Sequence, residues 1–292
     1  MQTTAENKVA TAQTAAKASF SFEVFPPRKD DGVDKIYATL ADLAPLQPDF
    51  ISVTYGAGGS ANSKGTLDIA SAIMDKHKTQ SIVHLPCIHQ SKESILGILN
   101  ECKARKLTHI LALRGDIVEG KGVSEDFRFA SDLVGFIKAQ GAFKVYAACY
   151  PEKHIAAKSF VEDIHHLKIK VDSGVSTLLT QLFFDNADFY RFKEACDIAN
   201  IAVPIIAGIM PVANKRQVLK ITSICGAKIP PKFAKILHKY EQNDRAMMDA
   251  GIAYAIEQIV DLLTSGVAGV HIYTMNNAYI ARRIHEAVKN LL

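Results

Sequence analysis

The chain of 292 residues has little excess charge, few cysteines and no long apolar run. Its 34 basic and 30 acidic residues are dispersed, with no basic stripe interleaved with aromatic residues, which argues against nucleic-acid binding. The five cysteines are odd in number and form no C-x-x-C pair, a pattern of reducing compartments rather than of disulfide frameworks. No apolar run approaches the roughly eighteen residues of a membrane span, and residues 1–18 lack the apolar centre of a secretory signal. We therefore expect a cytoplasmic globular protein with a flexible or helical leader over residues 1–18.

What the chain does have is a regular alternation of short apolar segments with helical patterns. The predicted strands cover residues 20–25, 50–54, 81–85, 109–116, 143–148, 175–181, 203–207 and 269–273. No shift in composition marks a domain boundary. Eight such units predict an α/β fold, a single (β/α)8 TIM-type barrel over residues 19–292, with extra helices before the eighth strand and at the C-terminus. A doubly wound open sheet is the competing architecture.

Polar side chains stand at the carboxyl ends of most predicted strands, and in a barrel those ends meet at one mouth. They are Glu23, Thr54, His84, Arg114, Asp116, Tyr150, Gln181 and Tyr273. Each has a bland explanation when taken alone. Glu23 could be a solvated edge residue, and His84 a core histidine bonded to a backbone carbonyl. Arg114 and Asp116 could form a loop ion pair of little energetic value. Together they are harder to explain by packing, because an apolar barrel has no reason to gather polar groups at one end.

Glu23 is the sharpest candidate for catalysis. It lies in the alternating segment FSFEVF, where Phe20, Phe22 and Val24 share one face and Ser21 and Glu23 the other. A carboxyl group in an apolar setting between phenylalanines would hold its proton more tightly and could act as a general acid. Such a step typically contributes about 10²–10⁴-fold in rate.

Two other patterns are weaker than they look. Residues 56–61 read GAGGSA after a strand and fit a dinucleotide fingerprint, but the next strand ends without the acidic residue that would hold a ribose. A flexible loop that lets a ligand approach the backbone is the better interpretation. His84, Cys87 and His89 suggest zinc, but no fourth ligand follows at a sensible spacing, so we predict no metal site.

Several motifs together resemble the methylenetetrahydrofolate reductase family, in its flavin-dependent bacterial-type catalytic domain. They are SFEVFPPR (21–28), FISVTYGAGG (50–59), HLPCI (84–88), HILALRGD (109–116), YPEKH (150–154), TQLFFD (180–185), GIMPV (208–212) and HIYTMN (271–276). The resemblance runs from about Phe20 to near the end of the chain and keeps the family's order.

The resemblance implies a barrel that holds FAD. NADH or NADPH would reduce the flavin, and the reduced flavin would pass a hydride to 5,10-methylenetetrahydrofolate to give 5-methyltetrahydrofolate. By position, Glu23 resembles the acid that opens the folate's five-membered ring, and Asp116 a carboxylate near both flavin and pterin. Gln181, Gln217 and Tyr273 resemble folate-binding positions, and Thr54 a residue of the nicotinamide pocket. The flavin-binding positions are Tyr55, Ala57, His84, Arg114, Gly115, Asp116, Ala130, Tyr150, His154, Ala157, Asp163, His166 and Lys170. We also expect a homo-oligomer and allow for a partner subunit.

The chain departs from the family pattern on the helix that binds the flavin, where His166 and Ile169 stand in place of asparagine and arginine. Ile221 replaces an aromatic residue that covers the substrate, and Asn277 an arginine after the eighth strand. Ile169 motivates the first of three alternatives that stay open. They are a flavin-free reductase that transfers hydride directly from NAD(P)H, a non-redox pterin- or folate-binding barrel, and a non-catalytic partner subunit that shares the fold.

Overall fold

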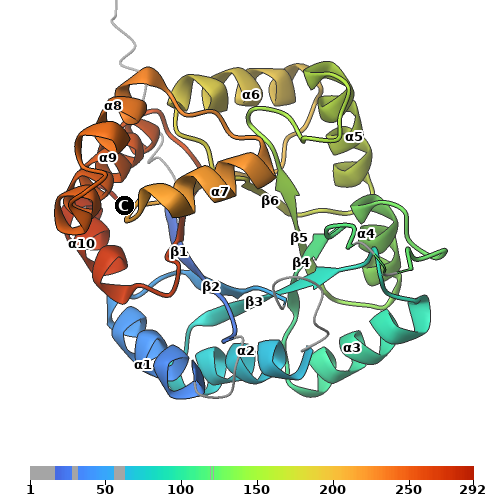
Figure 1. Ribbon diagram of the computed structural model, residues 1–292. Coiled ribbons are helices and arrows are strands. Elements are labelled where there is room, and N and C mark those ends of the chain that lie inside the picture. The colour runs from blue at the N-terminus through green and yellow to red at the C-terminus, as the bar shows by residue number, and fades with distance from the viewer. Residues whose placement is uncertain (1–16, 28–31, 56–62, 119, 121) are drawn as a thin grey trace, which may run out of the picture.

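The computed structural model describes residues 17–27, 32–55, 63–118, 120 and 122–292, and within them eight parallel strands close into a barrel (Figure 1). The strands follow one another in sequence order, and β1 pairs with both β2 and β8. Their bounds are β1 Ser19–Val24, β2 Phe50–Val53, β3 Gln80–Pro86, β4 His109–Leu113, β5 Lys144–Cys149, β6 Thr177–Thr180, β7 Ile205–Ile209 and β8 Gly269–Tyr273. The predicted (β/α)8 barrel is confirmed, because the pairing of the first strand with the last rules out an open sheet.

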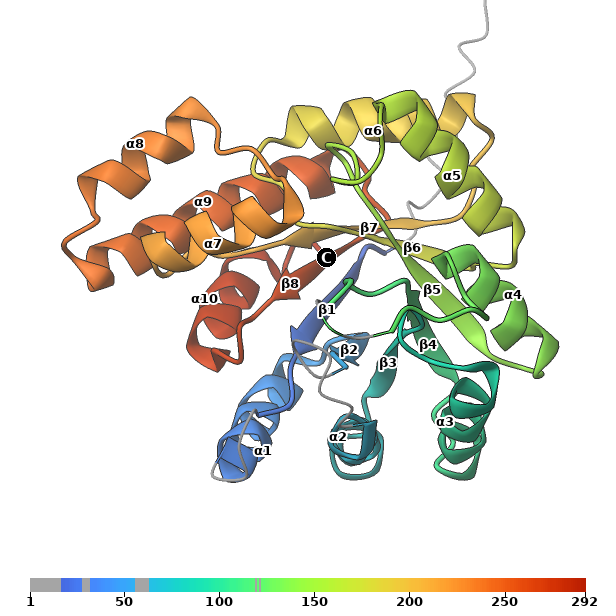
Figure 2. The ribbon, with the colours of Figure 1, turned by 45° about the vertical axis from the view of Figure 1, so that its right-hand side comes forward.

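Helices alternate with the strands and form the outer layer (Figures 1 and 2). They are α1 Val33–Leu43, the 3-10 turn η2 Ala44–Leu46, α2 Ser63–His77, α3 Lys92–Ala104, α4 Ala130–Ala139, α5 Phe160–Asp172, α6 Asn186–Ile198, α7 Lys215–Cys225, α8 Pro231–Lys239, α9 Asp244–Thr264 and α10 Ala278–Val288. The extra helix before the last strand is α8, and α10 follows that strand, as the sequence predicts.

Local sequence signals explain several of these boundaries. The Ser91 hydroxyl accepts a hydrogen bond from the Ser94 N–H and caps α3, while Gly141 follows α4 with a φ of 121° that favours glycine. Helix α4 begins at Ala130 and not near residue 125, because the Asp132 carboxylate accepts the backbone N–H of Phe129 at 2.9 Å. Strand β4 is also shorter than predicted and ends at Leu113.

Each strand has one face toward the helices and one toward the barrel axis. In β1, Phe22 and Val24 are fully buried in the core between sheet and helices, whereas Ser21 and Glu23 point inward. The floor of the barrel interior is a separate apolar cluster of Phe50, Ile82, Leu111, Tyr146, Leu179 and Ile206. The polar groups lie above this floor, toward the carboxyl ends of the strands.

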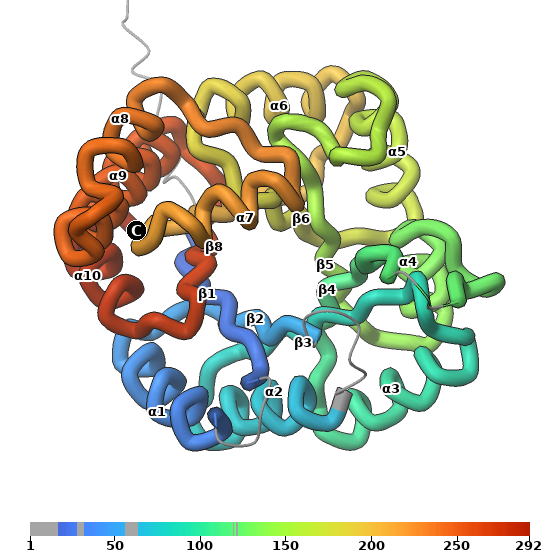
Figure 3. The backbone as a smooth tube through the Cα atoms, in the orientation of Figure 1, coloured from blue at the N-terminus to red at the C-terminus, as the bar shows by residue number. Residues whose placement is uncertain are grey.

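Helices α7, α8 and α9 lie on the β6–β8 side, where α7 runs beside the rim (Figures 2 and 3). A second apolar cluster packs them onto the strand ends, with Leu182, Phe184, Met210, Val212, Phe233 and Met247 among its members. This side of the mouth is therefore walled by protein. In the described part of the chain, no helix combines the length and apolar character that crossing a membrane requires.

Candidate functional site

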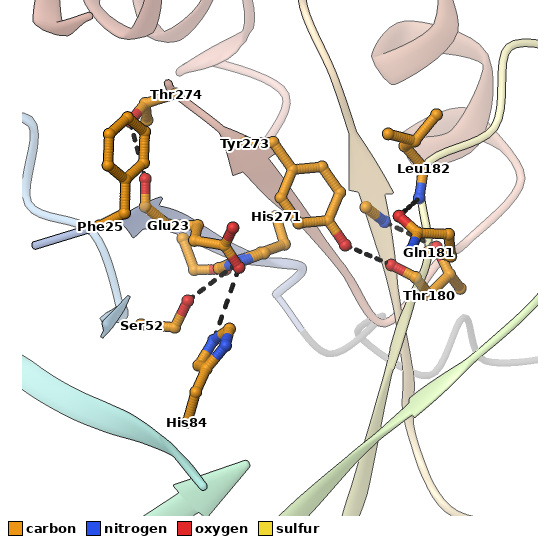
Figure 4. A network of polar contacts seen from close by, with 12 residues as sticks. Glu23, Phe25, Ser52, His84, Thr180, Gln181, Leu182, His271, Tyr273 and Thr274 are labelled. Atoms are coloured by element: carbon orange, nitrogen blue, oxygen red, sulfur yellow. Dashed lines mark hydrogen bonds and ion pairs between the residues drawn. The ribbon is translucent and has the colours of Figure 1, made fainter. Parts of the chain in front are cut away.

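Glu23 stands at the end of β1 and points into the barrel mouth (Figure 4). Its Oε2 atom lies 3.5 Å from Nε2 of His84 on β3 and 4.0 Å from Nε2 of His271 on β8. The Glu23 side chain is 20% exposed, whereas the two imidazole side chains are 8% and 0% exposed. Three strands thus bring one reachable carboxyl group and two buried rings together.

The surroundings of Glu23 differ from the apolar setting that the sequence suggested. Phe20 and Phe22 form an edge-to-face pair, with ring centroids 5.1 Å apart, on the opposite face of β1. The carboxyl group faces imidazoles and not phenyl rings, because the alternation of the strand sends its neighbours outward. The prediction that Glu23 points to the mouth holds, but the prediction of apolar neighbours was wrong.

His84 is a buried ring with an uncompensated nitrogen. Its Nε2 has no hydrogen-bond partner among the described residues, since the 3.5 Å contact with Glu23 is close enough for electrostatic attraction but does not form a hydrogen bond. Burial lowers the pKa of His84 to about 4, and the charge of Glu23 only partly opposes this. The ring is therefore neutral at neutral pH. The bland explanation of His84, in which a backbone carbonyl satisfies it, does not account for this nitrogen.

His271 was not singled out by the sequence, although it is central to the site. Its Nδ1 lies 2.8 Å from the Ser21 hydroxyl and its Nε2 lies 3.3 Å from the Ser52 hydroxyl. The ring also stacks on Phe50, with centroids 5.5 Å apart. Alternation along β8 places His271 on the same face as Tyr273, and this signal could have identified it.

Tyr273 spans the mouth from β8 toward β6 and donates a 2.5 Å hydrogen bond to the Thr180 carbonyl (Figure 4). Gly208 on the strand between them leaves room for this ring, because a Cβ there would lie 2.4 Å from the Thr180 oxygen and 2.6 Å from the Tyr273 hydroxyl. Beside it, the Gln181 amide oxygen accepts the N–H of Leu182 at 2.9 Å. Tyr273 and Gln181 therefore share this side of the mouth.

A cavity of about 450 Å³ opens on the other side, between the ends of β4 and β5 and helices α4 and α5. Ligand pockets usually have volumes of roughly 300–1,000 Å³. Eight of the predicted flavin-binding residues line it: Arg114, Ala130, Tyr150, His154, Ala157, Asp163, His166 and Lys170. Ile169 lines it as well. The lining does not include Thr54, Tyr55, His84, Gly115 or Asp116.

The turn after β4 does not contain the ion pair that the sequence suggested. Among the described residues, Arg114 pairs with no carboxylate, and its Nε–H donates to the Gly115 carbonyl at 3.3 Å. Gly115 has a φ of 85°, a conformation that favours glycine and turns the chain sharply. The two side chains therefore separate, which leaves the Arg114 guanidinium available at the cavity and the Asp116 side chain exposed at the rim.

Tyr150, His154 and Lys170 form the polar wall of the cavity. The rings of Tyr150 and His154 meet edge to face at 4.6 Å, and the Lys170 ammonium donates to the Ala148 carbonyl at 2.7 Å. Burial lowers the pKa values of His154 and Lys170 and raises that of Tyr150. Asp163 holds the loop before α5, because its carboxylate accepts the His154 backbone N–H at 2.8 Å.

Electrostatic effects link the acid side of the mouth to the cavity side. The pKa of Tyr273 is raised first by burial, next by the charge of Glu23, and less by Cys149 and Tyr150. Asp116 in turn contributes to the pKa shift of Tyr150. Because the strands are parallel, Glu23 at the carboxyl end of β1 and Asp116 just after the carboxyl end of β4 lie on the same rim, as the sequence predicted.

The remaining predicted residues lie around this rim with less specific contacts. The Thr54 N–H donates to the Val24 carbonyl at 3.0 Å, and the Tyr55 hydroxyl accepts from Gln90 at 3.4 Å. Gln217 is half-buried on the first turn of α7. Ala57 lies outside the described residues.

Two of the family departures also have a place in the structure. Asn277 caps α10 by accepting the Ile280 N–H at 3.3 Å, and Ile221 packs at the edge of the second apolar cluster. Both residues therefore have structural contacts of their own, which the sequence did not reveal.

Other features do not compete with this mouth. A cavity of about 300 Å³ lies at the amino ends of β7 and β8, away from the polar groups just described. The ring of His89 contacts the Gly122 and Asp116 carbonyls at 2.7 and 3.1 Å, which ties down the loop after β4. Within the described residues, no three His, Cys, Asp or Glu side chains are grouped to hold a metal ion.

Comparison with known proteins places the fold and the motifs in one family. The family model described as methylenetetrahydrofolate reductase matches residues 8–289. The 5,10-methylenetetrahydrofolate reductase of Escherichia coli is 34% identical over 273 residues, which is 94% of this chain and 91% of that protein. Methylenetetrahydrofolate reductase (NADH) 1 of Arabidopsis thaliana is 33% identical over 285 residues, 92% of this chain but 48% of that protein. The chain thus spans about half the length of the plant relative.

A solved structure has the same fold. It is an uncharacterized protein from Clostridium thermocellum that binds two copies of 5-methyl-5,6,7,8-tetrahydrofolic acid, with a TM-score of 0.63 and 13% identity. The match covers 95% of this chain and 96% of the chain of that structure. This likeness supports the barrel alone, whereas the family rests on the sequence matches. The chain belongs to the methylenetetrahydrofolate reductase family of oxidoreductases.

Proposed function

We propose that the protein reduces 5,10-methylenetetrahydrofolate to 5-methyltetrahydrofolate with NADH or NADPH, through bound FAD and with Glu23 as the general acid. The observation that carries the proposal is the pairing of a cavity with an acid at one rim. The cavity is lined by eight of the residues expected to hold the flavin, and Glu23 stands at the same mouth. The E. coli relative, which this chain matches over 94% of its length, carries the name of this activity.

The residues of the cavity suit a flavin nucleotide. Arg114 offers a guanidinium that no carboxylate in the described part of the chain pairs with, which favours a phosphate or an electron-rich ring edge. Tyr150 and His154 offer aromatic surface, and Ala130 and Ala157 leave space. The His154 Nδ1 accepts the Ala156 N–H at 3.0 Å, so its proton is on Nε2, which leaves this nitrogen a hydrogen-bond donor. When bound, FAD supplies a two-electron carrier between the nicotinamide and the folate.

The reaction consumes one proton, and Glu23 is the group proposed to supply it. Breaking one C–N bond of the folate's five-membered ring leaves the electron pair on nitrogen, where the Glu23 proton is transferred, and creates an iminium carbon that accepts hydride. Neutral His84 brings no positive charge that would compete for the carboxyl group. Asp116, exposed on the same rim, is proposed to stabilise the cation. Gln181, Gln217 and Tyr273 are proposed to hold the folate, and Thr54 the nicotinamide.

The visible spectrum of the purified protein and its response to NADH and to NADPH test this proposal. A flavin band that bleaches with the reduced nicotinamide and returns on adding methylenetetrahydrofolate, with 5-methyltetrahydrofolate as the product, is expected. Bleaching that a quinone such as menadione reverses, but methylenetetrahydrofolate does not, would overturn the folate assignment. An absence of both flavin and NAD(P)H oxidation would instead favour a non-redox folate-binding barrel or a partner subunit.

One observation favours a flavin-free reductase as the second candidate. Ile169 lines the cavity with 46% of its surface exposed, at the position where the family resemblance leads us to expect an arginine. Colourless protein that reduces methylenetetrahydrofolate with NAD(P)H, at a rate unchanged by added FAD, would establish this alternative. Under the main proposal, Ile169→Arg instead tightens FAD binding a few-fold in a fluorescence titration, because it adds a cation to the cavity.

A further inference from the structure

The carboxyl end of β1 has backbone support from β2, where the Val24 carbonyl accepts the Thr54 N–H at 3.0 Å, but little from β8. Its pairing with β8 ends at Glu23 and Tyr273. Pro26 and Pro27 follow, and neither has an N–H to donate. Phe25 therefore carries the last backbone donor before a segment without one, two residues beyond Glu23.

Side chains of the turn after β8 bond to β1 beyond the point where the backbone pairing stops, and Figure 4 shows one of them, Thr274, beside Glu23. The Asn276 amide makes two bonds to one residue, because its Oδ1 accepts the Phe25 N–H at 3.0 Å and its Nδ2 donates to the Phe25 carbonyl at 2.9 Å. The Thr274 hydroxyl donates to the Glu23 carbonyl at 2.7 Å. These side chains bond to the backbone of β1 and extend its contact with the β8 segment by two residues, from Glu23 to Phe25.

The turn adopts an unfavourable backbone conformation to make these bonds. Met275 and Asn276 have φ values of 51° and 56°, in the left-handed region that non-glycine residues seldom adopt. Asparagine is among the residues that tolerate it best. The Thr274 hydroxyl also accepts the Asn276 N–H at 3.1 Å, which braces the turn from inside. Such conformations persist where surrounding contacts over-determine them, and they cluster at functional sites.

The carboxyl group of Glu23 depends on this support. Within the described part of the chain, no hydrogen bond reaches its oxygens, and the nearest ring, His84, stays 3.5 Å away. The direction of the carboxyl group is therefore set by its backbone rather than by bonds at its tip. A shift of the β1 end moves the acid relative to a folate in the mouth.

We infer that Asn276 and Thr274 are positioning residues, which hold the end of β1 so that Glu23 points at the folate. This inference rests on the proposed function. It assigns them to the folate half of the reaction only, since neither residue lines the cavity between α4 and α5.

The test measures the two half-reactions of the FAD-loaded protein separately by stopped flow, in Asn276→Ala and Thr274→Val. The rate constant for reoxidation by methylenetetrahydrofolate is expected to fall about 10- to 100-fold, since small misplacements of a catalytic group have effects of this size. Reduction by NAD(P)H is expected to stay unchanged, and the folate KM to change much less than kcat. Asn276→Asp, which keeps the acceptor for the Phe25 N–H, should recover part of the loss.

Asn243→Ala is the matched control, since Asn243 also accepts one backbone N–H at a turn, at the start of α9. Thermal melting should fall similarly in Asn243→Ala and Asn276→Ala, but only the latter should slow the folate step and alter its pH profile. Equal slowing of both half-reactions, or a folate step within twofold of wild type, would overturn the inference. Wild-type protein without any folate half-reaction would overturn the proposed function itself, and is measured first.

Discussion

The two sides of the barrel mouth are built in opposite ways. On the β1–β8 side, the polar side chains around Glu23 bond to neighbouring groups, as in the contacts of His271 with the Ser21 and Ser52 hydroxyls and of Tyr273 with the Thr180 carbonyl, although Glu23 and His84 Nε2 themselves make no such bond among the described residues. On the β4–β5 side, Arg114 pairs with no carboxylate of the described residues, and a cavity of about 450 Å³ lies between the strand ends and helices α4 and α5. An acid needs a fixed direction, whereas a large cofactor needs room and uncommitted donors. The difference predicts that substitutions on the two sides affect different steps.

The largest effect is expected from Glu23→Gln, which keeps the size of the side chain but removes its proton. The folate half-reaction should slow by about 10²–10⁴-fold, while flavin reduction by NAD(P)H is unaffected. Glu101→Gln, on the exposed side of α3, is the control. An unchanged rate of the folate step in Glu23→Gln would show that another residue is the acid. The two sides of the mouth would then no longer differ in the reaction step that they affect.

The pH dependence of the free energy of unfolding should reveal how far His84, beside Glu23, is shielded from water. The pKa of His84 falls from 6.5 to about 4 on folding, so between these values the unfolded chain binds a proton that the folded protein does not. Stability is therefore present above about pH 6.5 and is lost as the pH falls toward 4, by up to about 3 kcal/mol. Urea unfolding at several pH values should show a smaller loss for His84→Gln than for wild type. The exposed His165→Gln should behave as wild type, and an identical slope in His84→Gln would contradict the prediction.

Gly208→Ala tests whether Tyr273 is packed as tightly as its contacts indicate. The added Cβ meets the Thr180 carbonyl and the Tyr273 hydroxyl, and the carbonyl belongs to the barrel backbone and yields poorly. We expect a loss of about 1–3 kcal/mol in urea unfolding and a raised folate KM, with flavin affinity retained. Gly135→Ala in α4 is the control, because no described atom outside its own helix lies within 4 Å of its Cβ position, and it should stabilise slightly.

Arg114→Ala tests the open side and should give the smallest effect of the four. Loss of one charge-assisted hydrogen bond weakens FAD binding by about tenfold, measured by fluorescence titration. The folate step of the fully loaded protein should be far less affected. Arg128→Ala, which removes an exposed arginine just before α4, should bind FAD as wild type does. If the rate of the folate step falls by a larger factor than the FAD affinity, Arg114 acts with the β1–β8 side and the prediction is wrong.

The sequence alone predicted the barrel and the polar residues at the strand ends, because both depend on local periodicity, whereas the cavity residues on α4 and α5 came from the family resemblance. Alternation in β1 separates Glu23 from Phe22, and the same rule turns His271 inward in β8. What it could not predict are contacts between distant segments. The bond of Asn276 to Phe25 spans 251 residues, and the separation of Arg114 from Asp116 depends on the turn at Gly115. The apolar setting expected for Glu23 failed for the same reason, since its neighbours come from β3 and β8.

The closure of the barrel by its first and last strands also sets an order of events during translation. Phe25 leaves the ribosome 251 residues before Asn276, which at roughly 5–20 residues per second is a wait of about ten seconds to one minute. Throughout that time, β1 has one exposed edge with unpaired amides and carbonyls. The newly made chain therefore carries its acid long before the segment that orients it, and it becomes competent only when β8 is inserted into the ring.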